Sequence, residues 1–394
     1  MNRTERIGHR RIPPFHGGIS HIFSSAVRGT VGFVKKNPVL SIAAALALIT
    51  SVIVPPDSEY IGYFDFRTLT CLFCTLAVIC ALKEIRFFYV CAERIISLMK
   101  NLRLAAIALV YITFIGSMLI ANDMALITFL PLGYLVLSCT GKERHMAYVF
   151  ILQNIAANLG GMLTPFGNPQ NLYLYTKFGI PNLEFMGIML PPFLLSITLI
   201  TICCLFVKSE EVRVTDEIVH FSPWRTGVYL ALFLLSILIV FRGIPYQIGL
   251  VVIPVALAFL DRKALAEVDY PLLFTFVFFF VFAGNMARID WVKDFFSGLM
   301  QANPLVYSAI SCQLISNVPS AILLSQFTDS YRELLVGVNV GGAGTLIASL
   351  ASLITFREYL KHNRGKALYY IAMFSVFNFG MLAVLLAFER FIIL

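Results

Sequence analysis

Two asparagines interrupt apolar segments of the chain in the same way. Asn122 follows Leu119-Ile120-Ala121, and Asn317 follows Leu314-Ile315-Ser316. An asparagine at such a break either caps the helix that follows or offers its amide to a bound molecule or ion. Because both segments carry it, we take Asn122, Asn317 and the adjacent Ser316 as candidate binding residues.

One carboxylate accompanies only the first of these breaks. Asp123 is the only acid well inside a predicted apolar span, and Val318 takes its place in the second segment. A carboxylate in such surroundings is costly and usually functional, which favours a proton or cation site. The alternative is that Asp123 caps the returning helix.

A second pattern follows each break. The residues 158–164 read NLGGMLT and the residues 339–345 read NVGGAGT, so that NxGGxxT occurs twice in the same order. Gly and Pro at these places interrupt a helix and free its peptide groups for ligands or for neighbouring side chains. The further binding candidates are Thr164, Asn168, Gln170, Asn171, Gly341, Gly342 and Thr345, supported by Asn158 and Asn339.

The composition places these residues in a membrane. Of the 394 residues, 59% are hydrophobic and 13% are charged, which leaves too little polar surface for a soluble protein of this size. The apolar runs are each long enough to cross a bilayer, which takes about 20 helical residues. The net charge of +8 therefore reflects membrane topology, and we expect no nucleic-acid partner.

We expect an all-α polytopic protein with about nine full spans and two re-entrant helical hairpins. The predicted parts are a basic tail (1–37), a first transmembrane repeat (38–207, hairpin 104–140), a loop (208–225) and a second repeat (226–394, hairpin 304–329). Within each repeat a span precedes an amphipathic interfacial helix, a broken hairpin, a broken span and a final span.

The charges orient these spans. Residues 1–37 carry seven Lys or Arg against one acid, Glu5, which places the N-terminus in the cytoplasm and predicts no cleavable signal peptide. Threading from there puts all but seven of the 30 basic residues on the cytoplasmic side and the C-terminus outside the bacterial inner membrane. The exceptions are Arg67, Lys177, Arg242, Arg288, Lys293, Arg332 and Arg390.

The threading gives the two repeats opposite orientations. Inverted repeats with interrupted helices in matching places are typical of secondary transporters, whose site lies near the middle of the membrane. Helix N-termini there offer free N–H groups to anions, and unwound carbonyl groups suit cations. The chain lacks GxxxxGK[ST], so we expect neither nucleotide nor ATP-driven transport.

Other chemistry is not indicated. The six His do not cluster, and the eight Cys lie in or beside apolar segments, so we expect no cofactor and no resident metal beyond a transported cation near Asn122 and Asn317. A membrane-embedded enzyme would show clustered His or carboxylates at membrane depth, and a passive channel would show flux insensitive to Asp123→Asn.

The motifs resemble those of the ion transporter superfamily, in particular bacterial anion permeases of the citrate-transporter-like group. The likeness rests on the residues 121–126 (ANDMAL), 164–172 (TPFGNPQNL), 316–320 (SNVPS) and 339–342 (NVGG). It implies two hairpins whose tips meet a central site, a homodimer and an elevator-like motion. The symporter branch has Ser-Asn-Thr tips, and the Asn-Asp tip here is closer to the arsenite and sodium/proton branches.

The leading hypothesis is ion-coupled transport of a small inorganic or organic anion, such as a di- or tricarboxylate, with sodium or a proton as the coupling ion. The alternative is arsenite efflux or sodium/proton exchange at Asp123. The sequence does not distinguish the substrate, the direction or the stoichiometry.

Overall fold

The computed structural model describes residue 34, residues 37–211 and residues 222–393. Most of the predicted basic tail and of the loop 208–225 therefore lies outside the described residues. In the described part the chain is helical throughout, and its one β-type contact is an isolated bridge between Asn101 and Glu211. The predicted all-helical, polytopic class is confirmed.

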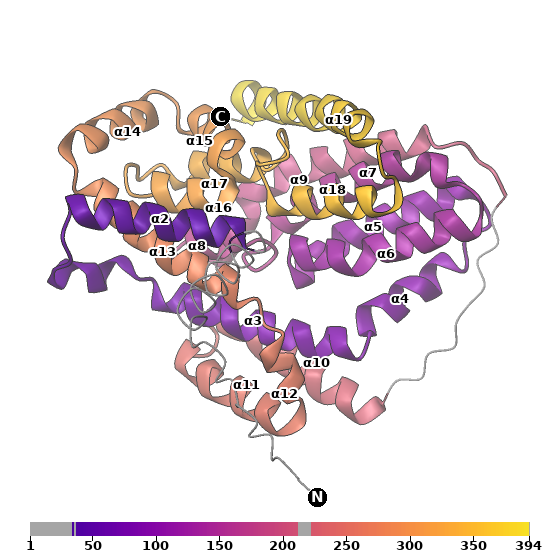
Figure 1. Ribbon diagram of the computed structural model, residues 1–394, viewed down its shortest axis with the longest axis horizontal. Helices are drawn as coiled ribbons and strands as arrows, with labels where there is room; N and C mark the ends of the chain where they lie inside the picture. The colour runs from indigo at the N-terminus through magenta and orange to yellow at the C-terminus, as the bar shows by residue number, and fades with distance from the viewer. Residues whose placement is uncertain (1–33, 35–36, 212–221, 394) are drawn as a thin grey trace, which may run out of the picture.

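The helices before residue 206 form the first half of the molecule (Figure 1). They are α2 (Pro38–Ile53), α3 (Phe66–Glu84), α4 (Phe87–Ile96), α5 (Leu102–Ile120), α6 (Asn122–Cys139), α7 (Met146–Gly160), α8 (Pro169–Lys177) and α9 (Asn182–Leu205).

The second half runs through the same series of parts. Its helices are α10 (Pro223–Val240), α11 (Tyr246–Leu260), α12 (Arg262–Ala266), α13 (Tyr270–Ala287), α14 (Asp290–Ala302), α15 (Pro304–Ile315), α16 (Asn317–Leu324), α17 (Tyr331–Val340), α18 (Leu350–His362) and α19 (Ala367–Phe388). The helices α3 to α9 thus have counterparts in α13 to α19.

The two halves exchange their parts rather than folding side by side. Helix α8, which follows the interruption after α7, packs on α16 and α17 of the second half. Helix α18 packs on α6 and α7 of the first half. Likewise α2 packs against α13, and α11 packs against α3. Each hairpin is therefore covered by a helix from the opposite half.

The hairpins open toward opposite ends of α9, which has 24 residues and is about 36 Å long. At its C-terminal end, Glu210 contacts Lys142 beyond α6 and accepts the backbone N–H of Leu102 at the start of α5. At its N-terminal end, Glu184 accepts a hydrogen bond from Tyr331, where the chain leaves the second hairpin. This arrangement agrees with inverted repeats.

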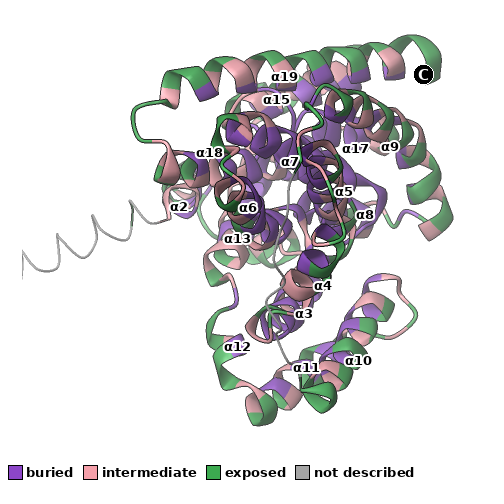
Figure 2. Cartoon of the chain, turned by 90° about the vertical axis from the view of Figure 1, so that its right-hand side faces the viewer, coloured by how far each residue is buried: buried purple, intermediate pink, exposed green. Residues whose placement is uncertain are grey.

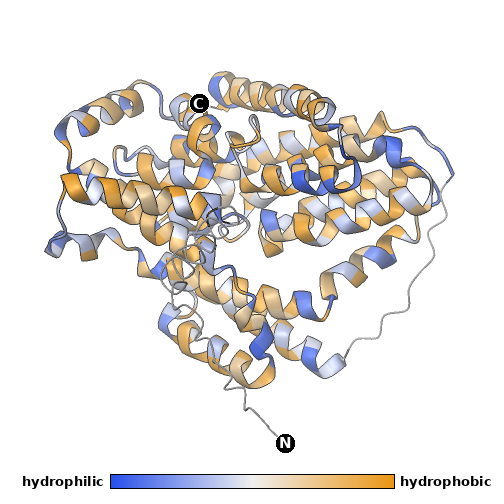
Figure 3. Ribbon diagram, viewed as in Figure 1, coloured by the Kyte–Doolittle hydropathy of each residue, from blue (hydrophilic) through white to orange (hydrophobic). Residues whose placement is uncertain are grey.

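Eight helices of the described chain are long and apolar enough to cross a bilayer, and hydrophobic residues predominate along most helices in Figure 3. In the most apolar 18-residue window of Glu143–Leu163, 94% of the residues are buried, whereas the share is 28% for Pro223–Val240. Figure 2 shows the same contrast between the enclosed α7 and the exposed α10, α11 and α19. Helix α7 is therefore the central element on which the first hairpin packs, and its counterpart α17 supports the second hairpin in the same way.

The two hairpins differ in length. Helices α5 and α6 have 19 and 18 residues, whereas α15 and α16 have 12 and 8. By length α5 and α6 are each able to cross the bilayer, so the part-way insertion of the first hairpin stays a prediction.

Candidate functional site

Each hairpin turns on a single residue. Ala121 has φ 65° and Ser316 has φ 75°, in a region that residues with a side chain rarely adopt. Holding such a conformation costs about 1–3 kcal/mol, which the surroundings must supply. Each break predicted from the sequence is therefore a turn at a single residue. Asp123 lies within the first turn of α6.

Both tips are held by the same backbone hydrogen bond. The N–H of Asn122 donates to the Gly167 carbonyl at 3.2 Å, and the N–H of Asn317 donates to the Ala348 carbonyl at 2.9 Å. Gly167 and Ala348 both lie three residues beyond the threonine of NxGGxxT. The broken span of each half therefore supports the hairpin tip of that half.

The tip asparagines bind the backbone of the residue that follows each of them. The Oδ1 of Asn122 accepts the N–H of Asp123, and the Oδ1 of Asn317 accepts the N–H of Val318, both at 2.9 Å. The Nδ2 of Asn122 donates to the Oδ1 of Asn158 at 3.1 Å. Neither α6 nor α16 has a side-chain cap, so Asp123 does not cap the returning helix in this structure.

The threonines of the repeated motif bind the hairpins. The hydroxyl of Thr164 donates to the Met118 carbonyl at 2.7 Å, and that of Thr345 donates to the Gln313 carbonyl at 3.1 Å. Met118 and Gln313 each lie three residues before the turn residues Ala121 and Ser316. These contacts satisfy carbonyls that the broken helices leave free, and Gln313 is a supporting residue that sequence reasoning missed.

A polar network joins the two halves at their breaks. The hydroxyl of Ser349 donates to Asn158 Oδ1 at 2.8 Å, and the Nδ2 of Asn168 donates to Asn339 Oδ1 at 3.2 Å. Asn339 in turn donates to Asn171 Oδ1 at 2.6 Å. Asn168 and Ser349 occupy matching positions, directly before α8 and α18. Each break is therefore linked to the residue that precedes the exchanged helix.

The remaining motif residues organise the backbone. The Nδ2 of Asn171 donates to the carbonyls of Gly161, Met162 and Thr164 at 3.2–3.3 Å. The Gly341 carbonyl accepts from the side chain of Gln313, and a Cβ built on Gly342 would lie 3.4 Å from the Nδ2 of Asn317.

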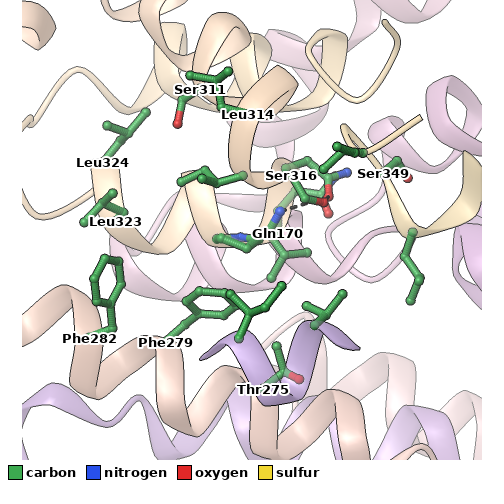
Figure 4. A pocket seen from close by; sticks show the side chains of 18 of the residues that line it. Gln170, Thr275, Phe279, Phe282, Ser311, Leu314, Ser316, Leu323, Leu324 and Ser349 are labelled. Atoms are coloured by element: carbon green, nitrogen blue, oxygen red, sulfur yellow. Dashed lines mark hydrogen bonds between the residues drawn. The ribbon is translucent and has the colours of Figure 1, made fainter. Parts of the chain in front are cut away.

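A cavity of about 630 Å³ lies between the tips and the helices α2, α13, α14 and α15. In Figure 4, Gln170, Ser316 and Ser349 lie near one another, and Phe279 and Phe282 lie on the opposite wall. Among the candidates, those that line the cavity are Asn122, Asp123, Gln170, Ser316 and Asn317. Those that do not are Asn158, Thr164, Asn168, Asn171, Asn339, Gly341, Gly342 and Thr345.

The charge of the cavity is confined to one residue. Among the described residues that line it, Asp123 is the one carboxylate, and none is Lys or Arg. Asp123 Oδ1 is buried and has no hydrogen-bond partner in the described chain. The same holds for Gln170 Oε1. Unused acceptor atoms of this kind suit a cation, a proton or a hydrogen-bond donor.

The expectation of free N–H groups at the tips is only partly met. At the second tip the N–H groups of Asn317 and Val318 are both bonded, and residue 319 is a proline. Donors to an anion must therefore come from side chains such as the Asn317 amide, since the Ser349 hydroxyl already donates to Asn158, with the positive end of the α16 dipole adding a favourable potential.

Sequence reasoning missed four polar residues that line the cavity, namely Thr275, Tyr307, Ser311 and Ser349. Ser349 was detectable, because continuing the NxGGxxT alignment places it opposite Asn168. Among the described residues no group of three or more His, Cys, Asp or Glu is placed to hold a metal ion.

The comparison with known proteins agrees with this geometry. Residues 30–330 match the model of a family described as citrate transporter. The chain belongs to that family. This confirms the resemblance to citrate-transporter-like permeases, and it makes the protein a member of a transporter family with a multi-pass membrane architecture.

Two relatives have names that give no substrate. An "uncharacterized transporter" of Methanocaldococcus jannaschii is 32% identical over 79% of this chain and 86% of its own length. An "inner membrane protein" of Escherichia coli K12 is 28% identical over 69% of this chain and 74% of its own length. Their names indicate transport and an inner membrane without specifying a substrate.

Proposed function

We propose that this protein is an ion-coupled secondary transporter of a small anion, including di- and tricarboxylates, that works by an elevator-like alternating-access motion. The single observation that carries the proposal is that both hairpin tips, Asn122 and Asn317, line one cavity of about 630 Å³. The tips come from inverted halves, so a molecule held between them touches both halves at once.

The lining supports an anion accompanied by a cation. Asn317 offers an amide donor, and the N-termini of α6 and α16 offer positive dipole ends. Since no Lys or Arg lines the described cavity, a multiply charged anion needs a compensating charge. Sodium or a proton at Asp123 would neutralise this carboxylate and remove its repulsion of the anion, which is the reason for proposing ion coupling.

The cellular arrangement belongs to the same proposal. The basic residues favour a cytoplasmic N-terminus and an outside C-terminus in the bacterial inner membrane, and the family resemblance favours a homodimer. Accessibility labelling of single cysteines and crosslinking in membranes would test these two statements independently of transport.

The experiment that tests the function is a screen in proteoliposomes. The purified chain is reconstituted, and the uptake of labelled citrate, succinate, phosphate and sulfate is measured with and without imposed pH and sodium gradients. We expect gradient-dependent uptake of at least one carboxylate above protein-free liposomes, and we expect that Asn317→Ala abolishes it. The absence of uptake for every anion would contradict the proposal.

A second candidate function rests on Asp123. Asp123 lines the cavity, and its buried Oδ1 has no hydrogen-bond partner in the described chain, as sodium/proton exchange or arsenite efflux at this residue would require. Sodium-driven proton movement without any added anion, or arsenite extrusion from cells, would favour this alternative.

A further inference from the structure

A second and much smaller cavity lies on the other side of Asp123. It has a volume of about 30 Å³ and is enclosed by the first hairpin tip, α3, the start of α8 and the start of α13. Its polar lining residues are Thr75, Asp123 and Asp269, and the other lining residues are apolar. Asp123 lines both cavities, so it separates the large one from the small one.

The polar atoms of the small cavity are not satisfied by protein. Asp123 Oδ1 and Thr75 Oγ1 are both buried and lack a hydrogen-bond partner in the described chain. Buried polar groups of this kind usually bind ordered water. A cavity of about 30 Å³ has space for about two water molecules at roughly 15 Å³ each, and a hydroxyl and two carboxylates are suitable partners for them.

Asp269 connects this cavity to the edge of the membrane. It directly precedes α13, its Oδ1 accepts the N–H of Leu272 at 3.0 Å, and its side chain is partly exposed. The neighbouring segment α12 carries Lys263, which pairs with Glu84 at the end of α3. The start of α13 therefore lies at a charged, water-facing boundary, whereas Asp123 lies at the hairpin tip.

We propose that Asp269, Thr75 and Asp123 form a short water-filled proton path between the membrane face at which α13 begins and the large cavity. A proton taken from bulk water by the Asp269 carboxylate passes through the ordered water to the Asp123 carboxylate. Asp269 then returns to its anionic form, and Asp123 becomes neutral. The reverse transfer releases the proton to the same face.

The charges around Asp123 suit this transfer. Asp269 lines the small cavity together with Asp123, and Tyr307 lies on the wall of the large cavity. Among the described residues that line either cavity, none is Lys, Arg or His. Two carboxylates that share one water-filled cavity repel each other when both are ionised, and a single shared proton removes that repulsion.

The inference deepens the proposed transport function, on which its biological role rests, by assigning the coupling-ion route to Asp269 and Thr75. The site is formed between the first hairpin and the helices α3 and α13. A relative motion of the hairpin would therefore separate Asp123 from Asp269 and interrupt the path.

The path is tested without any substrate. The full-length chain in liposomes is treated with the apolar reagent dicyclohexylcarbodiimide, which adds to protonated carboxyl groups in apolar surroundings, and the labelling of Asp123 is measured by peptide mass spectrometry between pH 5 and pH 9. We expect Asp123 to be labelled. We expect Asp269→Asn to move the labelling curve to lower pH by about half a unit or more, because a neighbouring negative charge is lost.

The chain offers a matched control. Asp65 precedes α3 as Asp269 precedes α13, and its Oδ1 accepts the N–H of Thr68 at 3.0 Å, but it does not line the small cavity. Asparagine also caps helices, so both variants keep their caps. We expect Asp65→Asn to give the wild-type curve. The inference is overturned if Asp269→Asn also gives the wild-type curve, or if Asp123 is never labelled.

A second variant tests the water itself. Thr75→Val keeps the side-chain volume and removes the unpartnered hydroxyl. We expect it to slow the protonation of Asp123 after a pH jump several-fold, measured as the infrared carboxyl band that is absent in Asp123→Asn. An unchanged rate contradicts a role for Thr75. Because neither readout needs a substrate, shifted labelling without anion uptake refutes the transport proposal alone, and uptake with unshifted labelling refutes the path alone.

Discussion

The hydroxyl of Ser349 donates a hydrogen bond to the side-chain oxygen of Asn158, 2.8 Å away and in the opposite half of the molecule. Asn158 also accepts from Asn122 at the first hairpin tip. A residue at the start of α18 is thereby connected to the tip of the first hairpin through a single amide.

This connection predicts that Ser349→Ala weakens both stability and transport. Removing one of two donors to a buried oxygen should cost about 1 kcal/mol, seen as a lower melting temperature in detergent. Ser349 also lines the cavity, so we expect a larger loss in uptake than stability alone explains. Ser138→Ala, outside the cavity, is the control, and equal uptake in both variants would count against a role of Ser349 in the cavity.

The hairpin tips should be needed for transport rather than for insertion. We expect Asn122→Ala and Asn317→Ala to abolish anion uptake in proteoliposomes while the protein remains in the membrane. Asn363→Ala is the matched control, because Asn363 is partly buried near Met146 and outside the cavity. Uptake at the wild-type rate in either tip variant would remove that asparagine from the site.

Asp123 should determine the pH dependence of transport. Asp123→Asn keeps the size of the side chain but removes its titration, so we expect a flattened pH profile of uptake. Asp261→Asn, at the cap of α12, serves as the comparison. A profile identical to that of the wild type would leave Asp123 without a role in ion coupling.

The contact between the first hairpin and the loop after α9 should respond to acid. Hydrogen bonds from Lys142, assisted by the charge of Arg144, lower the pKa of Glu210 below its ordinary value of 4.5. The stabilisation is present above the unfolded-state pKa and is lost as the pH falls through the lowered value. We expect Glu210→Gln to have a lower melting temperature than the wild type at pH 7 and the same melting temperature at strongly acidic pH. The control Glu211→Gln should have the melting temperature of the wild type at both pH values.

The glycine at the end of α7 should not tolerate a methyl group. A Cβ on Gly160 would lie 2.3 Å from the Phe114 carbonyl and 2.6 Å from Ser117 Oγ. Gly160→Ala should therefore destabilise the protein by about 1–3 kcal/mol, measured by thermal unfolding. Gly187→Ala, where no atom lies within 4 Å of the added Cβ, should unfold as the wild type does.

Much of the architecture followed from local pattern. The first repeat was expected to begin at residue 38, where α2 begins, and the second hairpin was expected over 304–329, which contains α15 and α16. Apolar runs bounded by charges and turn residues specify such helices locally. The repeat was also readable, since Asn122 and Asn317 recur with the same neighbours.

The partners of the broken backbone were not readable. Whether Thr164 faces a ligand or the Met118 carbonyl depends on how the hairpin packs, which no local pattern encodes. The same applies to Asp269, whose position before α13 looks like an ordinary cap, and to the single-residue turn at Ala121. Long-range packing decides these contacts, because a freed peptide group can be satisfied by several different neighbours.

The exchange of α8 and α18 between the halves bears on how the protein is made. When the ribosome has completed the first half, its hairpin still lacks the cover that α18 provides, and Asn158 lacks the hydroxyl of Ser349. Assembly in the membrane therefore finishes late, once residues near 350 have been synthesised and inserted. Two separately encoded halves would be expected to accumulate only when both are produced in the same cell.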